Sequence, residues 1–123
     1  MNDKKVMIVE DEPYIVESLE FILTRDGFTV VSHGDGATAL SMIVDAAPDI
    51  LILDAMLPGK TGFDLLREIR NTASVQGLPV LMLTAKGQKR DLEVAVESGA
   101  NEFMTKPFSN SAVVDAVRRL ANV

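Results

Sequence analysis

The stretch Ile50-Leu51-Ile52-Leu53-Asp54 decides the fold, because four aliphatic residues run without alternation into a single acid. A strand that covers one face of a sheet alternates apolar and polar residues, whereas a strand buried on both faces is apolar throughout. We therefore predict a buried parallel strand over residues 50–53, with Asp54 just beyond its carboxyl end. The turn-forming Pro58-Gly59-Lys60 follows soon after.

Other short runs of β-branched and aliphatic residues have the same character. They span residues 5–9, 29–32, 79–84 and, more weakly, 102–105. Helical segments lie between them, so five strands alternate with five helices. This order predicts a doubly wound α/β fold, with a five-stranded parallel sheet and right-handed crossovers, in one domain over residues 1–123.

Apolar residues in the helical segments recur three or four positions apart, which predicts one buried face for each helix. These faces consist of Ile15, Val16, Leu19, Ile22 and Leu23; of Ala37, Leu40, Ile43 and Val44; of Phe63, Leu66 and Ile69; and of Val113, Val117 and Leu120. The segment 88–98 has only a thin stripe of Leu92, Ala95 and Val96 among charged residues. We expect few buried contacts to oppose a shift of that helix.

The helices also carry end signals. Pro13 suits a first helical position, Gly27 and Gly99 suit C-terminal caps, Thr61 with Asp64 suits a capping box, and Ser109 suits an N-cap.

Composition narrows the class of function. The net charge of -6 and the twelve scattered basic residues argue against direct nucleic-acid binding. The chain has no cysteine, and its first residues lead into a strand rather than into a signal-peptide apolar region. No apolar run approaches the roughly twenty residues of a membrane span. We therefore expect a cytoplasmic protein without membrane contact of its own.

Reactive side chains follow the predicted strands. Glu10 and Asp11 follow the first, Asp54 the third and Lys106 the fifth, while Thr84 ends the fourth. In an open α/β sheet, ligands bind beyond the carboxyl ends of the strands, so these groups are expected to converge. Hard carboxylate oxygens suit Mg2+, and an ammonium suits phosphoryl oxygens. The pattern predicts a site for a divalent cation and a phosphoryl group.

Four motifs at these positions give the chain a family resemblance. They are Val9-Glu10-Asp11-Glu12, Leu53-Asp54-Ala55-Met56-Leu57-Pro58-Gly59, Leu83-Thr84-Ala85 and Thr105-Lys106-Pro107-Phe108. In this order and spacing, the chain resembles the receiver domain of two-component response regulators over essentially its full length. The resemblance implies the flavodoxin-like (CheY-like) version of the doubly wound fold.

The resemblance also implies residue roles. Asp54 would accept a phosphoryl group from a sensor histidine kinase or a histidine phosphotransfer protein, with help from Lys106 and Thr84. Glu10, Asp11, Asp54 and the backbone carbonyl of Met56 would bind Mg2+ or Mn2+. The domain would be a phosphoacceptor switch that assists its own phosphorylation and slow dephosphorylation, rather than a turnover enzyme, and no other cofactor site is implied.

Signalling would depend on Thr84 and Phe103. Thr84 would hydrogen-bond to the new phosphoryl group, and the ring of Phe103 would turn inward as the loop after Thr84 moves. The surface of the fourth helix, fifth strand and fifth helix would then change its affinity for a partner. The output target is open, and so is the choice between a monomer and a phosphorylation-dependent dimer.

Other interpretations stay open at this point. A single acid after a strand is more often a turn or capping residue, and His33 is interpreted as a loop residue without a role. The chain could be a receiver-like interaction module that never uses phosphate. It could also be an aspartyl-phosphate phosphohydrolase, although such enzymes typically carry a second Asp where Met56 stands. A nucleotide or flavin site is weaker still, because no G-x-G-x-x-G or Walker loop follows the first strand.

Overall fold

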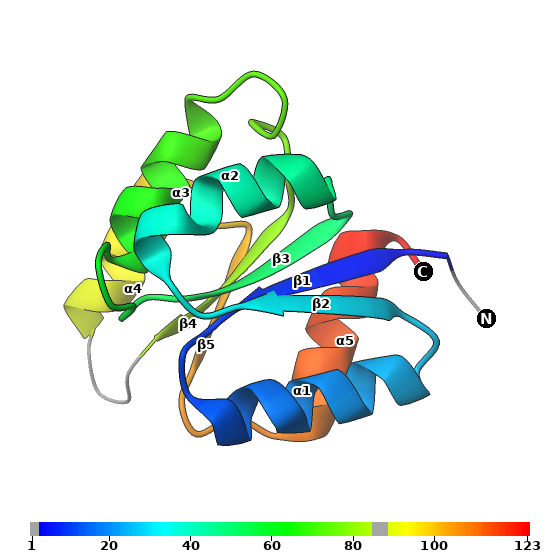
Figure 1. Ribbon diagram of the computed structural model, residues 1–123. Helices are drawn as coiled ribbons and strands as arrows, with labels where there is room; N and C mark the ends of the chain where they lie inside the picture. The colour runs from blue at the N-terminus through cyan, green and yellow to red at the C-terminus, as the bar shows by residue number, and fades with distance from the viewer. Residues whose placement is uncertain (1–2, 85–88) are drawn as a thin grey trace.

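The computed structural model describes residues 3–84 and 89–123, which form one five-stranded parallel sheet between two layers of helices (Figure 1). The strands lie in the order β2-β1-β3-β4-β5. The elements are β1 (Lys5–Val9), α1 (Pro13–Arg25), β2 (Thr29–His33), α2 (Gly36–Ala46), β3 (Ile50–Asp54), α3 (Gly62–Arg70), β4 (Val80–Thr84), α4 (Lys89–Ser98), β5 (Glu102–Thr105) and α5 (Asn110–Ala121). The predicted doubly wound fold is confirmed.

Burial on both faces explains the apolar runs of the inner strands. All five residues of β3 and of β4 are buried, and so are the last four of β1. Successive residues point to opposite faces, so Leu51 and Leu53 pack into one core cluster, and Ile50 and Ile52 into the other. The edge strands β2 and β5 are only partly buried, which explains their weaker patterns.

The helices divide between the two faces of the sheet. Figure 1 shows α2 and α3 over one face, and α1 and α5 side by side over the other. Leu65, Leu66 and Ile69 anchor α3 in the first core cluster, whereas Leu19 and Leu23 anchor α1 in the second. Among the described residues, no helix is long and apolar enough to span a membrane.

Most helix-end predictions are confirmed. Pro13 is the first residue of α1, while Gly27 and Gly99 adopt positive φ just after α1 and α4. The hydroxyl of Thr61 accepts a hydrogen bond from the amide of Asp64, and that of Ser109 accepts one from the amide of Ala112, so both residues are N-caps.

The predicted apolar face of α2 is partly wrong. Ala37 and Val44 are exposed, and the buried side of the helix consists of Gly36, Ala39 and Ile43. Small residues dominate that side because α2 begins in close contact with the β3–α3 loop, where the amide of Gly36 donates to the carbonyl of Pro58.

Element ends differ from the predictions by a residue. β2 extends to His33, β4 begins at Val80, and Asp54 is the last residue of β3 instead of the first residue beyond it. The predicted helix start at Gln88, the side chains of Leu92 and Ala95, and Ala85 of the third motif lie outside what the structure describes.

Strand order also fixes where a ligand site belongs. The chain passes from β1 to the edge strand β2 and then returns to β3, on the other side of β1. The connections therefore leave β1 and β3 toward opposite faces, and a crevice opens between their carboxyl ends. Glu10 follows β1 and Asp54 ends β3, at this switch point.

Candidate phosphoryl and metal site

Three carboxylates converge at the switch point. One oxygen each from Glu10, Asp11 and Asp54 lies within 4.8 Å of the other two. Glu10 and Asp54 are only 2% and 3% exposed, whereas Asp11 faces solvent. The amide of Glu12 donates to Oε1 of Glu10 at 3.1 Å and fixes that carboxylate from the start of α1. The structure therefore brings together the three acids that the sequence singled out.

Lys106 joins the cluster from the segment after β5. Its Nζ lies 3.2 Å from Oε2 of Glu10 and 3.3 Å from Oδ1 of Asp54. The Lys106 side chain is 22% exposed and therefore mostly buried. A single ammonium thus faces two buried carboxylates at the mouth of the sheet.

The crowding shifts the pKa values of two groups. Burial and, after it, the charge of Asp54 raise the pKa of Glu10 to about 7, although the Glu12 amide and Lys106 act in the opposite direction. Burial alone would lower the pKa of Lys106, but the charges of Asp54 and Glu10 outweigh it and raise the pKa. Lys106 is therefore held as a cation, and the acids carry more negative charge than it neutralises.

This imbalance fits a divalent cation. Mg2+ favours hard oxygen ligands, and a cation among Glu10, Asp11 and Asp54 would relieve the repulsion that raises the pKa of Glu10. The donor set contains no nitrogen or sulfur ligand that would favour a softer metal. The residues present therefore fit the magnesium ion that the family resemblance implies.

Thr84 and Met56 border the acids from β4 and from the β3–α3 loop. Thr84 is buried, and its hydroxyl donates to the carbonyl of Met104 on β5 at 3.5 Å. The amide of Met56 donates to Oδ1 of Asp54 at 3.2 Å, while the Met56 side chain is 64% exposed. The backbone of Met56 thus lies at the site and its side chain faces solvent.

Phe103 stands apart from this group. It lies on β5, paired in register with Met82, and 42% of it is exposed. In this structure its ring is a surface feature of β5, so its predicted role in switching stays a prediction.

The sequence reasoning missed an apolar cleft beside Lys106. It has a volume of about 460 Å3 and lies between the start of α1 and the segment after β5. Its lining residues are Glu12, Tyr14, Ile15, Ser18, Lys106, Pro107, Phe108 and Asn110. Tyr14 is 86% exposed, and an aromatic residue on the solvent side of a first helical turn was the available signal.

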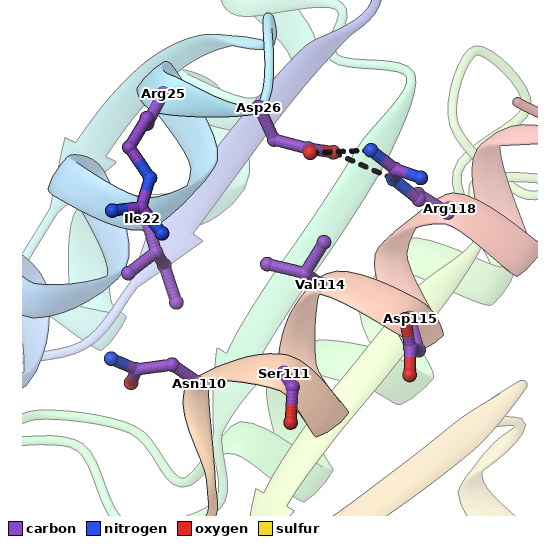
Figure 2. A pocket seen from close by; sticks show the side chains of 8 residues that line it. All are labelled: Ile22, Arg25, Asp26, Asn110, Ser111, Val114, Asp115 and Arg118. Atoms are coloured by element: carbon purple, nitrogen blue, oxygen red, sulfur yellow. Dashed lines mark hydrogen bonds and ion pairs between the residues drawn. The ribbon is translucent and has the colours of Figure 1, made fainter.

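A second hollow, of about 480 Å3, lies between α1 and α5 (Figure 2). Arg118 of α5 reaches Asp26 with two hydrogen bonds, the one from Nε being 2.7 Å long. That contact lowers the pKa of Asp26. None of the predicted site residues lines this hollow, and Arg118 and Asp26 of its lining form an ion pair.

Solved structures support the same interpretation. A crystal structure of a response regulator from Chloroflexus aurantiacus J-10-fl is similar at 34% identity and a TM-score of 0.94, covering 99% of this chain and 100% of that one. The chemotaxis response regulator CheY4 of Vibrio cholerae is similar at 27% identity and a TM-score of 0.89, covering 97% of this chain and 99% of that one.

A third similar structure contains a metal. It is the receiver domain of a sensor histidine kinase from Pseudomonas aeruginosa PAO1, with a magnesium ion coordinated in its active site cleft. It is 26% identical with a TM-score of 0.90, and the match covers 99% of this chain and all of that one. The sequence profile of the response regulator receiver domain matches residues 6–118. The fold, the acid cluster and this match together show that the chain belongs to the family of response regulator receiver domains.

Proposed function

We propose that this domain is a phosphorylation-dependent switch of a two-component system and that Asp54 is its phosphoacceptor. The observation that carries the proposal is the buried carboxylate of Asp54, held at the mouth of the sheet with Lys106 at 3.3 Å and two further acids beside it. Lys106 and the amide of Met56 both contact Oδ1 of this carboxylate.

The reaction would transfer a phosphoryl group from a phosphohistidine of a kinase or phosphotransfer protein. A carboxylate oxygen of Asp54 bonds to phosphorus, the phosphorus–nitrogen bond breaks, and the donor imidazole keeps the electron pair and takes up a proton. Positioning and neutralisation of the phosphoryl charge supply most of the help in such transfers. Lys106 already lies at Asp54 and would neutralise part of that charge.

Magnesium would supply the remaining positive charge. Glu10, Asp11, Asp54 and the backbone carbonyl of Met56 would hold it, and it would offset the repulsion among the three acids. Burial and Asp54 raise the pKa of Glu10, which would make phosphorylation depend on the cation at neutral pH.

The change at Asp54 would reach the surface through Thr84. Its hydrogen bond to Met104, at 3.5 Å, is at the long limit for a hydroxyl, so exchanging it for a phosphoryl oxygen would cost little. Met104 follows Phe103 on β5. The exposed surface that includes Val96 of α4 and Phe103 of β5 is where we expect partner affinity to change.

The apolar cleft beside Lys106 would receive the phosphodonor protein. A donor that places phosphohistidine at Asp54 must cover Lys106, and Tyr14, Pro107 and Phe108 offer apolar surface around it. Tyr14→Ala would therefore slow transfer from a protein donor and leave phosphorylation by acetyl phosphate unchanged. An equal loss with both donors would contradict this docking site.

The deciding experiment is incubation with acetyl phosphate and Mg2+, followed by intact-mass and size-exclusion measurements. We expect one phosphoryl group per chain on the wild type and none on Asp54→Asn. Asp45→Asn, on the exposed surface of α2, is the matched control and is expected to be modified like the wild type. A wild type that stays unmodified would favour the phosphate-independent module, and sustained turnover of a phosphate ester would favour the phosphohydrolase.

A further inference from the structure

The segment 55–61 joins β3 to α3 and is called here the acceptor loop. It starts directly after Asp54 and contains Met56, whose amide donates to the Asp54 carboxylate. Its placement therefore sets how the backbone of Met56 lies relative to Asp54. Two glycines outside the loop contact its backbone, Gly62 at its start and Gly36 at its middle.

Gly62 packs against the strand end itself. Its amide donates to the carbonyl of Ala55 at 2.9 Å. This hydrogen bond joins the residue that follows the acceptor loop to the first residue of the loop. A Cβ added to Gly62 would lie well inside 3.0 Å of the Asp54 carbonyl oxygen and 2.9 Å from Cα of Ala55. Real Cβ atoms do not approach so closely, and the atoms in the way belong to the backbone.

Neither the end of β3 nor helix α3 can move away from Gly62 easily. The amide of Ala55 donates to the carbonyl of Leu83 at 2.9 Å, which ties the end of β3 to β4. On the other side, Leu65 and Leu66 are fully buried and fix α3 in the core. Close-packed interiors yield little, so the strain of an added methyl group would fall on the acceptor loop.

Gly36 packs against the middle of the same loop. It is the first residue of α2, and its amide donates to the carbonyl of Pro58 at 3.1 Å. A Cβ there would lie inside 3.0 Å of the Lys60 carbonyl oxygen and 3.1 Å from that of Pro58. Between these two carbonyls Gly59 has a φ of +83°, which restricts the ways in which the loop can move aside.

We propose that Gly36 and Gly62 are positioning residues of the phosphorylation site, because only a residue without a side chain lets α2 and α3 hold the acceptor loop against β3. The inference rests on the proposed function for its effect on phosphorylation. Neither glycine touches the phosphoryl group; both act through Met56 and Asp54. A misplacement of about 1 Å at a reacting group can cost roughly 100-fold in rate.

The test uses Gly36→Ala and Gly62→Ala with two matched controls. Gly77→Ala adds its methyl group where no atom lies within 4 Å. Gly34→Ala adds one close to the acids but only at ordinary contact, 3.5 Å from the Glu10 carbonyl oxygen. Each variant is examined by circular dichroism and urea unfolding, by Mg2+ titration calorimetry, and by the rate of acetyl phosphate modification at saturating Mg2+.

We expect Gly36→Ala and Gly62→Ala to remain folded, to bind Mg2+ about 10-fold or more weakly, and to be modified about 10- to 100-fold more slowly. Gly34→Ala and Gly77→Ala should match the wild type in both measurements. A loss of urea stability with unchanged Mg2+ affinity and unchanged rate would show a merely structural role and overturn the proposal. Failure of both variants to fold would also overturn it, because the strain would then fall on the fold instead of the loop.

The proposed function can fail separately. If the wild type binds Mg2+ but forms no phosphoryl adduct, Asp54 is not a phosphoacceptor. The Mg2+ titrations would still decide whether the two glycines position the metal-binding groups.

Discussion

Charged side chains have different partners at the carboxyl ends and at the amino ends of the strands. At the carboxyl edge, Lys106 faces Glu10 and Asp54, with the further acid Asp11 nearby. Near the amino ends of β4 and β5, Arg70 has no carboxylate partner among the described residues. Its guanidinium donates instead to neutral oxygens, namely the carbonyls of Gln76, Leu78 and Gly99 and the side chain of Asn101.

The contrast is between an arginine whose hydrogen bonds are all made within the fold and a cluster of acids whose negative charge exceeds the charge of Lys106. Arg70 links α3 with the segments before β4 and β5, and every donor has a fixed acceptor, so nothing is left to bind. At the carboxyl ends of the strands, burial and repulsion from Asp54 together raise the pKa of Glu10 to about 7. Repulsion of this kind opposes folding and favours cation binding.

The largest effect is expected from Lys106→Met. Without Lys106 the phosphoryl charge loses its protein cation, and modification by acetyl phosphate should slow by about 100-fold or more. The two buried carboxylates would also lose their partner, which should lower the free energy of unfolding by about 3 kcal/mol at most, because Glu10 can take up a proton. Lys106→Arg is the control. It should restore stability more fully than the rate of phosphorylation, since the planar guanidinium places its charge differently from an ammonium. An unchanged rate in Lys106→Met would contradict the role of Lys106.

Arg70→Met should lower stability and leave the phosphorylation rate unchanged. It would remove the Arg70 hydrogen bonds to three backbone carbonyls and to Oδ1 of Asn101, which keeps its bond from the Val80 amide, and would lower the free energy of unfolding by about 3 kcal/mol. Phosphorylation of the folded protein at saturating Mg2+ should stay unchanged. Arg67→Met is the matched control on the same helix: its pair with Asp64 is exposed, and its loss should cost about 0.5 kcal/mol or less. Equal urea midpoints for Arg70→Met and the wild type would show that these bonds do not stabilise the fold.

The sequence allowed the charged residues at the carboxyl ends of the strands to be predicted, but not the contacts of Arg70 near the amino ends. Asp54 and Lys106 could be located because strands buried on both faces are recognisable as apolar runs, and their carboxyl ends must meet at one edge. Arg70 gives no such signal, because an arginine in the last turn of a helix is expected from the helix dipole alone. Its acceptors are mostly backbone carbonyls, and Gly99 lies 29 residues further along the chain.

The glycine contacts and the face of α2 were equally hard to predict. Periodicity favoured Ala37 and Val44 as buried residues, because apolar character was the only guide. The structure buries Gly36 instead, since the close approach of the acceptor loop excludes a side chain there. A requirement for no side chain becomes visible only when the two backbones are placed together.

A smaller effect is expected from Glu10→Gln in the absence of metal. Folded Glu10 keeps its proton up to about pH 7, whereas in the unfolded chain it loses it near pH 4.5. The folded state therefore binds more protons between these values, and its stability falls as the pH rises from about 4.5 to about 7. Glu10→Gln should remove this part of the pH dependence, while Glu17→Gln, exposed on α1, should keep it. Urea midpoints from pH 5 to 8 measure the difference, and parallel curves for Glu10→Gln and wild type would refute it.

The smallest effect is expected from Met56→Asn. The Met56 side chain is exposed beside Asp54 and offers no polar atom to orient a water that attacks the phosphoryl group. An amide there would orient the water without removing its proton, so the adduct should decay a few-fold faster, well short of the ~100-fold of a general base. Met42→Asn is the control, because Met42 is also exposed but lies on α2. The decay is followed by intact mass after acetyl phosphate is removed, and equal decay of the Met56→Asn and wild-type adducts would reject the idea. A faster decay with an unchanged urea midpoint would place control of the phosphoryl lifetime in the exposed loop, separate from the buried charges to which we attribute the proposed dependence on Mg2+.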